Sequence, residues 1–453
     1  MKTLTMSKVK LSNVNSLTST VKKNSVYSLL LKILSIFISF WSVRVAFEFT
    51  GSKQIYGLWL TILSVISWLG LLNAGLGNGL RNKLAQAIAV NDTQNAKAYV
   101  STSYAFIFVI SMGCSLLFLV GTSFIDWRIA FNADYISKAY FSILIMILVL
   151  SYFIQLILST INAICFAYNE STLPSLFTFL SNLLYVICLY ILKNLNISGI
   201  VVLGVVYSLT ILFVLLSASF VLFLKKYKEV RPSFKYVNTS YVKDLIGNGV
   251  KFFLLEIAAV IIFTTDSMVI THVVGNEEVT IYQLVMKIFS VFTIVASTVM
   301  VPLWSAFTHA YSKEDVVWIK KVVKKILLIM IPLIVCILIF SNFVNLILRI
   351  WIGKGIAAPT ALIFCVAVYI GVSIWSNFFA YFLNGINKIN GQLITVGLGA
   401  ILNIPLSIYF AKHLDFGAIG VVMATILCLL PFAIAGPIIS KKEIKKISQK
   451  TKM

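Results

Sequence analysis

The sequence predicts an all-α polytopic membrane protein with about twelve transmembrane helices, and three observations support this fold class. Of the 453 residues, 60% are apolar and only 11% are charged. The apolar residues form continuous runs of about 20, the length that an α-helix needs to cross the hydrocarbon core. The runs do not alternate every second residue, as the strands of a transmembrane barrel do. Helices are therefore the expected spanning elements, because they satisfy their own backbone hydrogen bonds.

The apolar runs place the twelve expected spans along the chain. Met1 to Asn24 is polar and too long for a cleavable signal, so the first span should stay in the protein. The expected spans are residues 25–47, 56–76, 99–121, 138–166, 172–192, 199–224, 249–271, 281–304, 326–348, 359–382, 392–411 and 418–438.

The distribution of basic residues predicts the orientation of these spans. The net charge is +22, and 26 of the Lys and Arg residues outside the spans fall on the side that holds both termini, against six on the other side. By the positive-inside rule both termini should be cytoplasmic. The basic loops then meet anionic lipid headgroups, which makes a nucleic-acid partner unnecessary to explain the charge.

A weak internal repeat at a shift of about 221 to 224 residues divides the chain into two parallel six-helix lobes. Residues 27–32 align with 251–256, Asn91-Asp92 with Glu314-Asp315, and Asn182 with Asn403. Two such lobes around a central cleft form a recurrent alternating-access architecture. The expected parts are a cytoplasmic amino tail (1–24), an N-lobe (25–224), a basic cytoplasmic linker (225–248), a C-lobe (249–438) and a basic cytoplasmic tail (439–453).

Ionisable side chains at membrane depth predict a transporter. A charge at the bilayer centre costs about 2.5 to 3.5 kcal/mol on the lenient insertion scale, so such groups usually face a wet cavity or a partner. The candidate pathway residues are Lys32, Arg44, Lys251, Glu256, Asp266 and Lys287.

Counting residues from the helix ends separates these six groups into two layers. Lys32, Lys251 and Glu256 fall in the cytoplasmic half, and Arg44, Asp266 and Lys287 in the external half. Their summed charge is positive, which would attract an anion such as a phosphate or an acidic sugar. Lys32, Arg44 and Lys251 could instead snorkel to the headgroups along their long stems.

No enzymatic or metal-binding motif is visible in the sequence. The six Cys fall inside spans at irregular spacing, and the three His are scattered over loop ends. No phosphate-binding glycine loop, nucleophile elbow or paired-carboxylate motif occurs. We therefore expect no enzymatic activity, no metal and no cofactor; whether a proton or Na⁺ couples transport at Glu256 or Asp266 is left open.

The cytoplasmic ends of the second and eighth predicted spans resemble a known family. Residues 71–83 with Asp92, and residues 302–311 with Asp315, are similar to two signatures of polysaccharide lipid-carrier flippases of the O-antigen type. These flippases form part of the multidrug/oligosaccharidyl-lipid/polysaccharide exporter superfamily. Residues 263–266, Tyr282 and residues 287–290 also fit, whereas Glu256 and Ser267 stand where many relatives have amides.

The resemblance implies a fold, a substrate and a location. It implies the fold of multidrug and toxin extrusion (MATE) transporters and the movement of an undecaprenyl-pyrophosphate-linked oligosaccharide to the outer leaflet of the bacterial plasma (inner) membrane. A glycan polymerase and a chain-length regulator are the partners that it implies. Four basic residues could contact the pyrophosphate or merely set orientation: Arg81, Lys83, Lys320 and Lys321.

Three other functions remain open at this point. A MATE-type multidrug or cation antiporter shares the fold but favours an acidic cleft. A peptidoglycan lipid-precursor flippase commonly has two extra helices. A membrane glycan polymerase or ligase usually needs a longer external loop than the roughly 16 residues found here.

Overall fold

The computed structural model describes residues 31–450 except 32, 90, 169, 171, 243–249, 313 and 354. Almost all of these residues are helical, and the chain divides into two compact units. Unit 1 comprises described residues within Met1–Thr50, Leu69–Arg128 and Asp134–Gly249. Unit 2 comprises Gly51–Trp68, Ile129–Ala133 and the described residues within Val250–Met453. The lobe boundaries predicted from the repeat stay a prediction.

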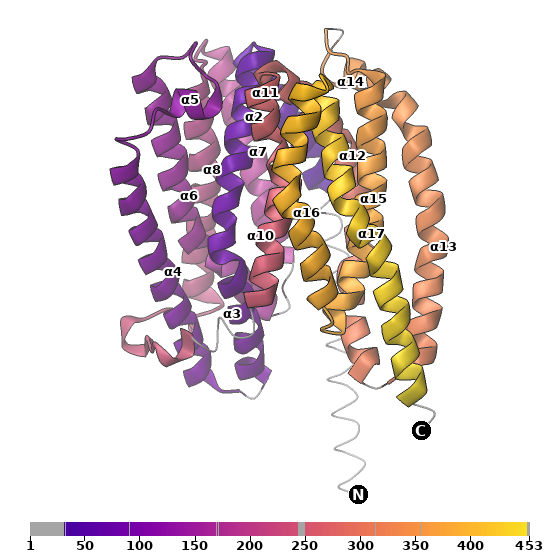
Figure 1. Cartoon of the computed structure of the whole chain (residues 1–453). Helices are drawn as coiled ribbons and strands as arrows, with labels where there is room; N and C mark the ends of the chain where they lie inside the picture. The colour runs from indigo at the N-terminus through magenta and orange to yellow at the C-terminus, as the bar shows by residue number, and fades with distance from the viewer. Residues whose placement is uncertain are drawn as a thin grey trace, which may run out of the picture. The chain divides into compact units, whose positions relative to one another are not determined.

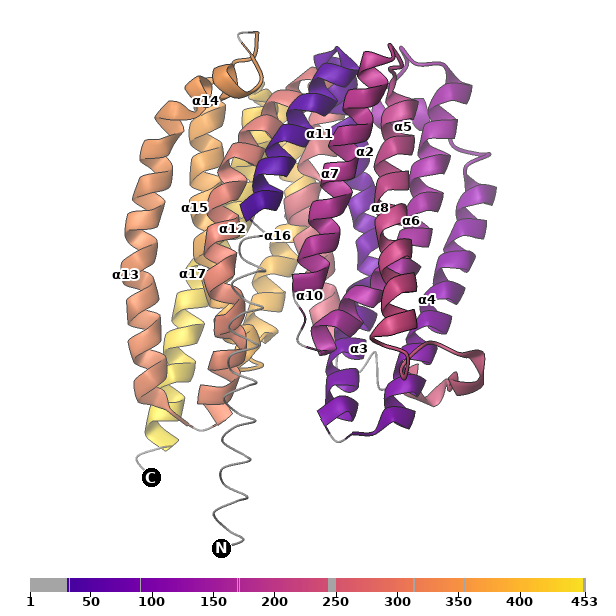
Figure 2. The ribbon, with the colours of Figure 1, turned by 180° about the vertical axis from the view of Figure 1, so that it is seen from behind.

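Unit 1 is built from long apolar helices that pack side by side (Figures 1 and 2). α6 packs on α8 and on α4, and α3 packs on α4 and α6. Its elements are a helix at Ile33–Thr50, α3 (Leu71–Ala89), α4 (Thr93–Gly121), α6 (Lys138–Ala167), α7 (Thr172–Asn194), α8 (Ile200–Lys225) and the short turn η2 (Phe234–Tyr236). α5 (Trp127–Phe131) runs from unit 1 into unit 2.

Unit 2 has the larger buried core, in which α15 and α17 pack on each other and α12 packs on α15. Figure 1 shows α13, α15 and α17 running side by side. Its elements are α2 (Lys53–Ser67), η1 (Trp68–Gly70), α10 (Val250–Thr264), α11 (Asp266–Val273), α12 (Asn276–Ser312), α13 (Val316–Phe340), η3 (Ser341–Phe343), α14 (Val344–Trp351), α15 (Thr360–Gly385), α16 (Asn390–Ile408), the π-helical turn η4 (Tyr409–His413) and α17 (Gly417–Lys450).

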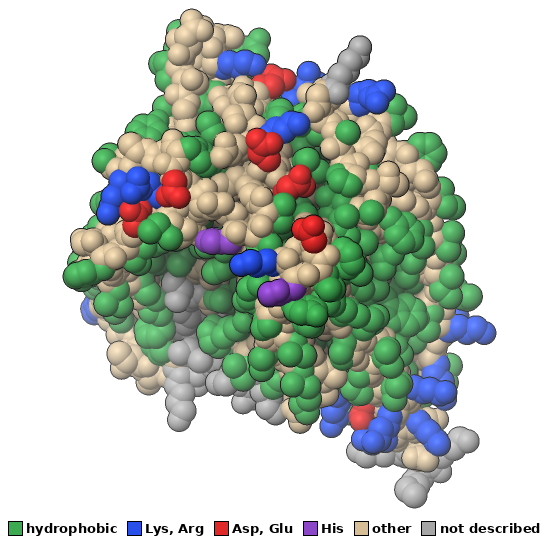
Figure 3. Space-filling model, turned by 45° about the horizontal axis from the view of Figure 1, so that its top comes forward, with side chains coloured by type: hydrophobic (Ala, Val, Ile, Leu, Met, Phe, Trp, Pro, Cys, Tyr) green, Lys and Arg blue, Asp and Glu red, His purple; other side chains and the backbone are tan. Residues whose placement is uncertain are grey.

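The helices have the surface of membrane-spanning segments. Figure 3 shows hydrophobic side chains covering their flanks, with Lys, Arg, Asp and Glu gathered towards their ends. In the described part of the chain, eleven helices are long and apolar enough to cross a membrane. The expected second span, residues 56–76, is present but broken, because α2 has only 15 residues and η1 separates it from α3. The multi-pass, all-helical fold class is confirmed.

Two aligned turns of the repeat have the same local structure. Asn91 and Glu314 both adopt a positive φ, 56° and 53°. Asp92 and Asp315 follow them and cap α4 and α13 by accepting hydrogen bonds from the backbone N–H three residues on, at 2.9 and 3.0 Å. A side-chain oxygen at this position satisfies a backbone donor that the first helical turn leaves unpaired. Both helix starts are therefore specified by a left-handed residue followed by Asp.

α2 is held against α11 and α12 by a close backbone contact and by hydroxyl pairs. Gly57 lies so close to α12 that an added Cβ would come within 1.6 Å of the Asn276 carbonyl oxygen. Thr61 and Thr271 join their hydroxyls at 2.7 Å, and Thr280 donates to the Lys53 carbonyl at 2.6 Å. Small residues and hydroxyl pairs are the usual means of close helix packing in membranes. This packing positions the residues of α2 that line the candidate site.

Candidate functional site

The seventh apolar span is broken in its middle, between α10 and α11. Thr265 separates the two helices, and no proline is involved. The hydroxyls of Thr264 and Thr265 donate to the carbonyls of Val260 and Ile261, both at 2.6 Å. Such back-bonding bends helices. A discontinuous spanning helix is a common feature of transporter binding sites.

Asp266 begins α11 directly after this break, and its carboxylate is the centre of a buried network. Its side chain is only 3% exposed. Tyr282 of α12 donates to one carboxylate oxygen at 2.9 Å, and Thr425 of α17 donates to the other at 3.0 Å. The Asn403 amide of α16 donates to Thr425 at 3.1 Å, and its carbonyl oxygen lies 3.2 Å from the Thr265 hydroxyl, a second and longer acceptor for the one hydrogen that Thr265 donates to Ile261. Four helices thus converge on one carboxylate.

Burial raises the free energy of the ionised Asp266 carboxylate. An ionised carboxylate away from water needs several hydrogen bonds, a counter-cation or a proton to be stable. The Tyr282 and Thr425 hydroxyls supply two of these hydrogen bonds. Because Asp266 is the first residue of α11, the positive end of the helix dipole also stabilises its charge. The site is therefore suited to gain or lose a small cation.

A pocket of about 280 Å³ opens beside Asp266 between α2, the α10–α11 break and α12. Ser64 donates to the Thr264 carbonyl, the Trp68 indole donates to the Thr264 hydroxyl, and Gln283 donates to Ser267, each at 2.6 Å. The described lining residues are Leu60, Leu63, Ser64, Ser67, Phe263, Thr264, Asp266, Ser267, Tyr282 and Gln283. Hydroxyl and amide groups at this depth need a wet or polar neighbour, which the pocket supplies.

Lys287 and Glu256, two other predicted residues of unit 2, are less buried than Asp266. Lys287 is half-buried on α12, four residues after Gln283 and therefore on the same helix face. Glu256 is exposed on α10. Lys251 lies in α10, but its side chain is outside the described part of the structure. Lys32 is outside that part altogether. The structure thus brings Asp266 and Lys287 onto neighbouring elements, and the wider pathway stays a prediction.

Arg44 lies in unit 1 and forms an ion pair that the sequence analysis missed. Its guanidinium donates to Glu48 at 3.0 Å, and Lys193 of α7 donates to the other oxygen of Glu48 at 2.8 Å. The side chains of Arg44 and Glu48 are 49% and 37% exposed. The i,i+4 spacing of Arg44 and Glu48 is the signal that could have revealed this pair. Its predicted grouping with Asp266 and Lys287 remains a prediction.

Of the four basic residues assigned to a pyrophosphate, two lie near the start of α13 and two lie within α3, away from its ends. Arg81 of α3 is exposed and holds its guanidinium 5.2 Å from the centre of the Phe166 ring, and Lys83 is half-buried. Lys320 and Lys321 are exposed in the first turns of α13, and Lys320 donates to Ser448 of α17 at 3.5 Å. Among the described residues, no group of three or more His, Cys, Asp or Glu is arranged to hold a metal.

No protein-family model matches the chain, but curated relatives cover most of it. A protein of Yersinia pseudotuberculosis named "Putative O-antigen export protein" is 23% identical over 410 residues, which is 88% of this chain and 90% of that one. A "Putative O-antigen transporter" of Salmonella typhi is 23% identical over 416 residues, 88% of this chain and 91% of that one. The resemblance to O-antigen lipid-carrier flippases predicted from the sequence is confirmed.

Solved transporter structures match the described architecture. An inward-facing multidrug resistance MATE family transporter superposes with a TM-score of 0.77 at 14% identity, over 94% of this chain and 99% of that one. This chain has the MATE fold. A MOP superfamily transporter of Pyrococcus furiosus, described as having a binding pocket of reversed polarity, matches with a TM-score of 0.67 at 15% identity over 94% and 96% of the two chains.

Within this MATE fold, the two positions that depart from the flippase pattern behave differently. Ser267 lies in the pocket and accepts the hydrogen bond from Gln283, so a hydroxyl serves there as a polar partner. Glu256 places a carboxylate on the exposed side of α10. Only the first departure alters the described surroundings of Asp266.

Proposed function

We propose that this chain flips an undecaprenyl-pyrophosphate-linked oligosaccharide, an O-antigen or capsular repeat unit, from the inner to the outer leaflet of the bacterial plasma membrane by alternating access. The observation that carries this proposal is the similarity to named O-antigen transporters over 88% of the chain. The relatives are named as an export protein and a transporter, which supports transport as the role of this chain.

The polar pockets at membrane depth fit this task physically. A sugar headgroup cannot cross hydrocarbon without replacing its water by other hydrogen-bonding groups, whereas a polyprenyl tail is stable among lipid chains. Ser64, Ser67, Ser267 and Gln283 supply such groups beside Asp266. A cleft lined in this way would accept the headgroup while the tail stays in the bilayer.

We infer the direction of transport from the distribution of basic residues. We propose that both termini, the end of α3 that follows Arg81 and Lys83, and the start of α13 with Lys320 and Lys321 are cytoplasmic, as the 26 to 6 distribution of basic residues predicts. These cations would then meet the pyrophosphate on the side where the lipid-linked sugar is made. A glycan polymerase and a chain-length regulator would act on the product on the other side.

We propose Asp266 as the group that couples transport to a cation. The carboxylate, the Tyr282 and Thr425 hydroxyls and the Asn403 amide oxygen form a set of hard oxygen donors within one network. Either a proton or Na⁺ would neutralise the buried charge. Transport measured under an imposed Na⁺ gradient and, separately, under a pH gradient distinguishes the two ions.

The second candidate is a MATE-type multidrug or cation antiporter. The named multidrug transporters among the solved structures and the buried carboxylate of Asp266 favour it. Cation-driven drug efflux from a pump-deficient strain expressing this chain would support this candidate. The same strain without efflux, together with restored glycan display in the assay below, would exclude it.

Complementation tests the proposed function directly. A bacterial strain that lacks its own O-antigen flippase, and that makes the matching lipid-linked repeat unit, should regain surface glycan when it expresses this chain. A strain depleted of its peptidoglycan lipid-precursor flippase serves as the parallel test. Rescue of the second strain and not the first would replace the O-antigen proposal by the peptidoglycan one.

A further inference from the structure

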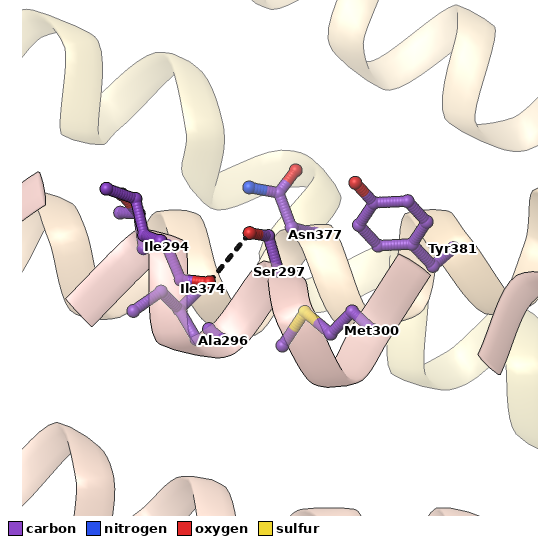
Figure 4. Close-up of a pocket in the computed structure, with 8 residues that line it drawn as sticks. Ile294, Ala296, Ser297, Met300, Ile374, Asn377 and Tyr381 are labelled. Atoms are coloured by element: carbon purple, nitrogen blue, oxygen red, sulfur yellow. Dashed lines mark hydrogen bonds between the residues drawn. The ribbon is translucent and has the colours of Figure 1, made fainter. Parts of the chain in front are cut away.

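A second pocket of about 240 Å³ lies in unit 2 between α12 and α15, away from the helix break. Figure 4 shows the amide of Asn377 and the hydroxyl end of Tyr381 pointing to the same side, next to Ser297 and Met300. The described lining residues are Thr293, Ile294, Ala296, Ser297, Met300, Ile374, Asn377 and Tyr381. All of them are uncharged, and the negative charge of Glu256 acts on Tyr381 from nearby, so this pocket disfavours an anionic ligand.

Asn377 is the residue that marks this pocket as a binding site. It is exposed although it lies in the interior of α15, eight residues before the helix ends at Gly385, or about 12 Å at 1.5 Å per residue. A primary amide facing hydrocarbon without hydrogen bonds costs several kcal/mol, about 2 to 7 by transfer scales. Its donation to Ser373 is long, at 3.4 Å, and uses one of the two amide hydrogens. The amide is therefore available to water or to a ligand.

The pocket has both polar and apolar surfaces, and its volume suits one small chemical group. Ala296, Met300 and Ile374 are buried and form an apolar floor. The Ser297 hydroxyl donates to the Ile294 carbonyl at 2.9 Å, as drawn in Figure 4, and keeps its lone pairs free to accept. Its volume is below the roughly 300 to 1,000 Å³ of sites for drug-sized ligands.

An acetamido group matches these surfaces better than a hydroxyl group does. Its methyl would lie on the apolar floor, while its carbonyl and N–H would pair with the Asn377 amide and the Tyr381 hydroxyl. A bare hydroxyl would leave the apolar floor uncovered and satisfy fewer partners. Tyr381 is held by an edge-to-face contact with Trp304, whose ring centroid is 5.9 Å away. The pocket is thus already shaped before a ligand enters.

The two pockets lie along one polar face of α12. Gln283, Lys287, Ser290 and Ser297 follow one another at helical spacings of four, three and seven residues, which keeps them on the same face. Gln283 and Ser297 are 14 residues apart, or about 21 Å along the axis. An extended chain of sugars can reach both pockets at once, whereas a compact drug molecule cannot.

We propose that the pocket formed by Ser297, Met300, Asn377 and Tyr381 binds a 2-acetamido sugar unit of the transported glycan. This proposal rests on the proposed transport of a lipid-linked oligosaccharide and names a specificity site for it. Asn377 and Tyr381 recognise the acetamido group, and Met300 contacts its methyl.

Saturation-transfer NMR on the purified full-length protein tests the ligand class. The probes are the methyl glycosides of 2-acetamido-2-deoxyglucose and of glucose. We expect the acetamido methyl to receive the strongest saturation, the plain glucoside to bind at least fivefold more weakly, and Asn377→Ala to weaken acetamido-sugar binding about tenfold. The matched control is Asn342→Ala, because Asn342 is an exposed amide at the end of α13 that donates to its own helix. Equal binding of the two glycosides, or unchanged binding to Asn377→Ala, overturns the proposal.

Glycan display in the complemented strain separates this inference from the proposed function. Wild-type chain that fails to restore display argues against the function itself. Wild-type chain that restores display, with Asn377→Ala and Tyr381→Phe reduced at least fivefold for an acetamido-containing repeat unit, supports the pocket assignment. Full display by both variants overturns the assignment and leaves the function intact. Tyr381→Phe keeps the ring that packs on Trp304, so its loss would reflect the hydroxyl.

Discussion

The two pockets of unit 2 are both lined by α12, yet they are built for different tasks. The Asp266 pocket lies at a helix break and contains a buried carboxylate with two hydroxyl donors. The Asn377 pocket lies between two continuous helices, and its described lining is uncharged. The first arrangement responds to a change of charge, and the second can distinguish neutral groups by shape and hydrogen bonding. The proposed coupling and recognition sites therefore lie in separate regions of one unit.

The difference extends to the backbone. At the Asp266 pocket, hydroxyls of Thr264, Thr265 and Ser64 satisfy carbonyls around the break. These bonds can be exchanged for bonds to water or to an ion at low cost, since each contributes only about 0.5 to 1.5 kcal/mol net. The Asn377 pocket has no such break in the described helices that form it. We therefore expect conformational change to begin at the Asp266 pocket.

The largest effect is expected from Asp266→Ala. It removes the acceptor of Tyr282, and a buried hydroxyl left without a partner costs about 1 to 3 kcal/mol; Thr425 loses the same acceptor but still reaches the Val421 carbonyl at 3.1 Å. Glycan display should fall below a tenth of the wild-type level at normal membrane abundance, while acetamido-sugar binding stays. Display is measured by surface labelling, with Asp134→Ala, an exposed carboxylate, as the control. Wild-type display by Asp266→Ala would remove this residue from the mechanism.

Gly57→Ala should disrupt the same pocket from outside. The added methyl would clash with the Asn276 carbonyl, so α2 must move away from α12 and the Asp266 pocket loses one wall. Overpacking of this kind costs about 1 to 3 kcal/mol or more. We expect a lower thermal midpoint for the purified protein and strongly reduced display. Gly113→Ala on α4, where a Cβ meets nothing within 4 Å, is the matched control. Equal midpoints for the two variants would contradict the packing described.

Lys287→Ala tests the stretch of α12 that lies between the pockets. If this cation guides an anionic part of the substrate, its loss should reduce display at least fivefold at normal membrane abundance, and Lys287→Arg should retain more activity than alanine does. Lys412→Ala, an exposed lysine of η4, is the control. Wild-type display by Lys287→Ala would show that this lysine only stabilises its surroundings.

Glu256 should have a smaller and sign-dependent effect. The carboxylate is exposed on α10, so Glu256→Gln keeps its shape and removes one negative charge. We expect display to change less than twofold for glutamine and to fall several-fold for Glu256→Lys. Surface labelling and membrane abundance are measured together. An equal loss for both substitutions would count against a purely electrostatic role.

Asp126 provides the smallest expected effect and lies outside both pockets. The Arg128 guanidinium donates to both oxygens of Asp126, at 3.1 and 2.9 Å, and holds the pKa of that carboxyl well below its usual range. A lowered folded-state pKa stabilises the protein fully above about pH 4, the unfolded value, and this contribution is lost as the pH falls further. Because the contribution is lost completely only below the lowered folded-state pKa, Asp126→Asn should lower the thermal midpoint slightly at pH 7 and by less at pH 3. Identical shifts at both pH values would contradict the pair.

The helices could be predicted from the sequence, because hydrophobic runs of the right length leave few alternatives. The expected span 138–166 became Lys138–Ala167, and 359–382 became Thr360–Gly385. The break at Thr265 was not predicted, since threonine also occurs in continuous helices. The exact extent of the second span was also missed: η1 begins at Trp68, whose indole donates to Thr264, 196 residues further along the chain, and such a distant contact is not visible in a local pattern.

The candidate site was only partly visible in the sequence, for a physical reason. Asp266 could be recognised because charge at membrane depth is rare, but its partners Asn403 and Thr425 are uncharged and lie 137 and 159 residues further along the chain. Asn377 and Tyr381 were missed for the same reason. Their i,i+4 spacing in an apolar helix is the signal that could have indicated a polar face.

Flipping in reconstituted vesicles tests the central claim most directly. Purified chain is placed in liposomes that contain a fluorescent polyprenyl-pyrophosphate-linked oligosaccharide with acetamido sugars, and the fraction of sugar accessible to an external quencher is followed over time. We expect wild-type protein to exchange the sugar between leaflets, and Asp266→Ala vesicles to behave like protein-free ones. Wild-type vesicles that match protein-free vesicles under both a Na⁺ and a pH gradient would contradict the account.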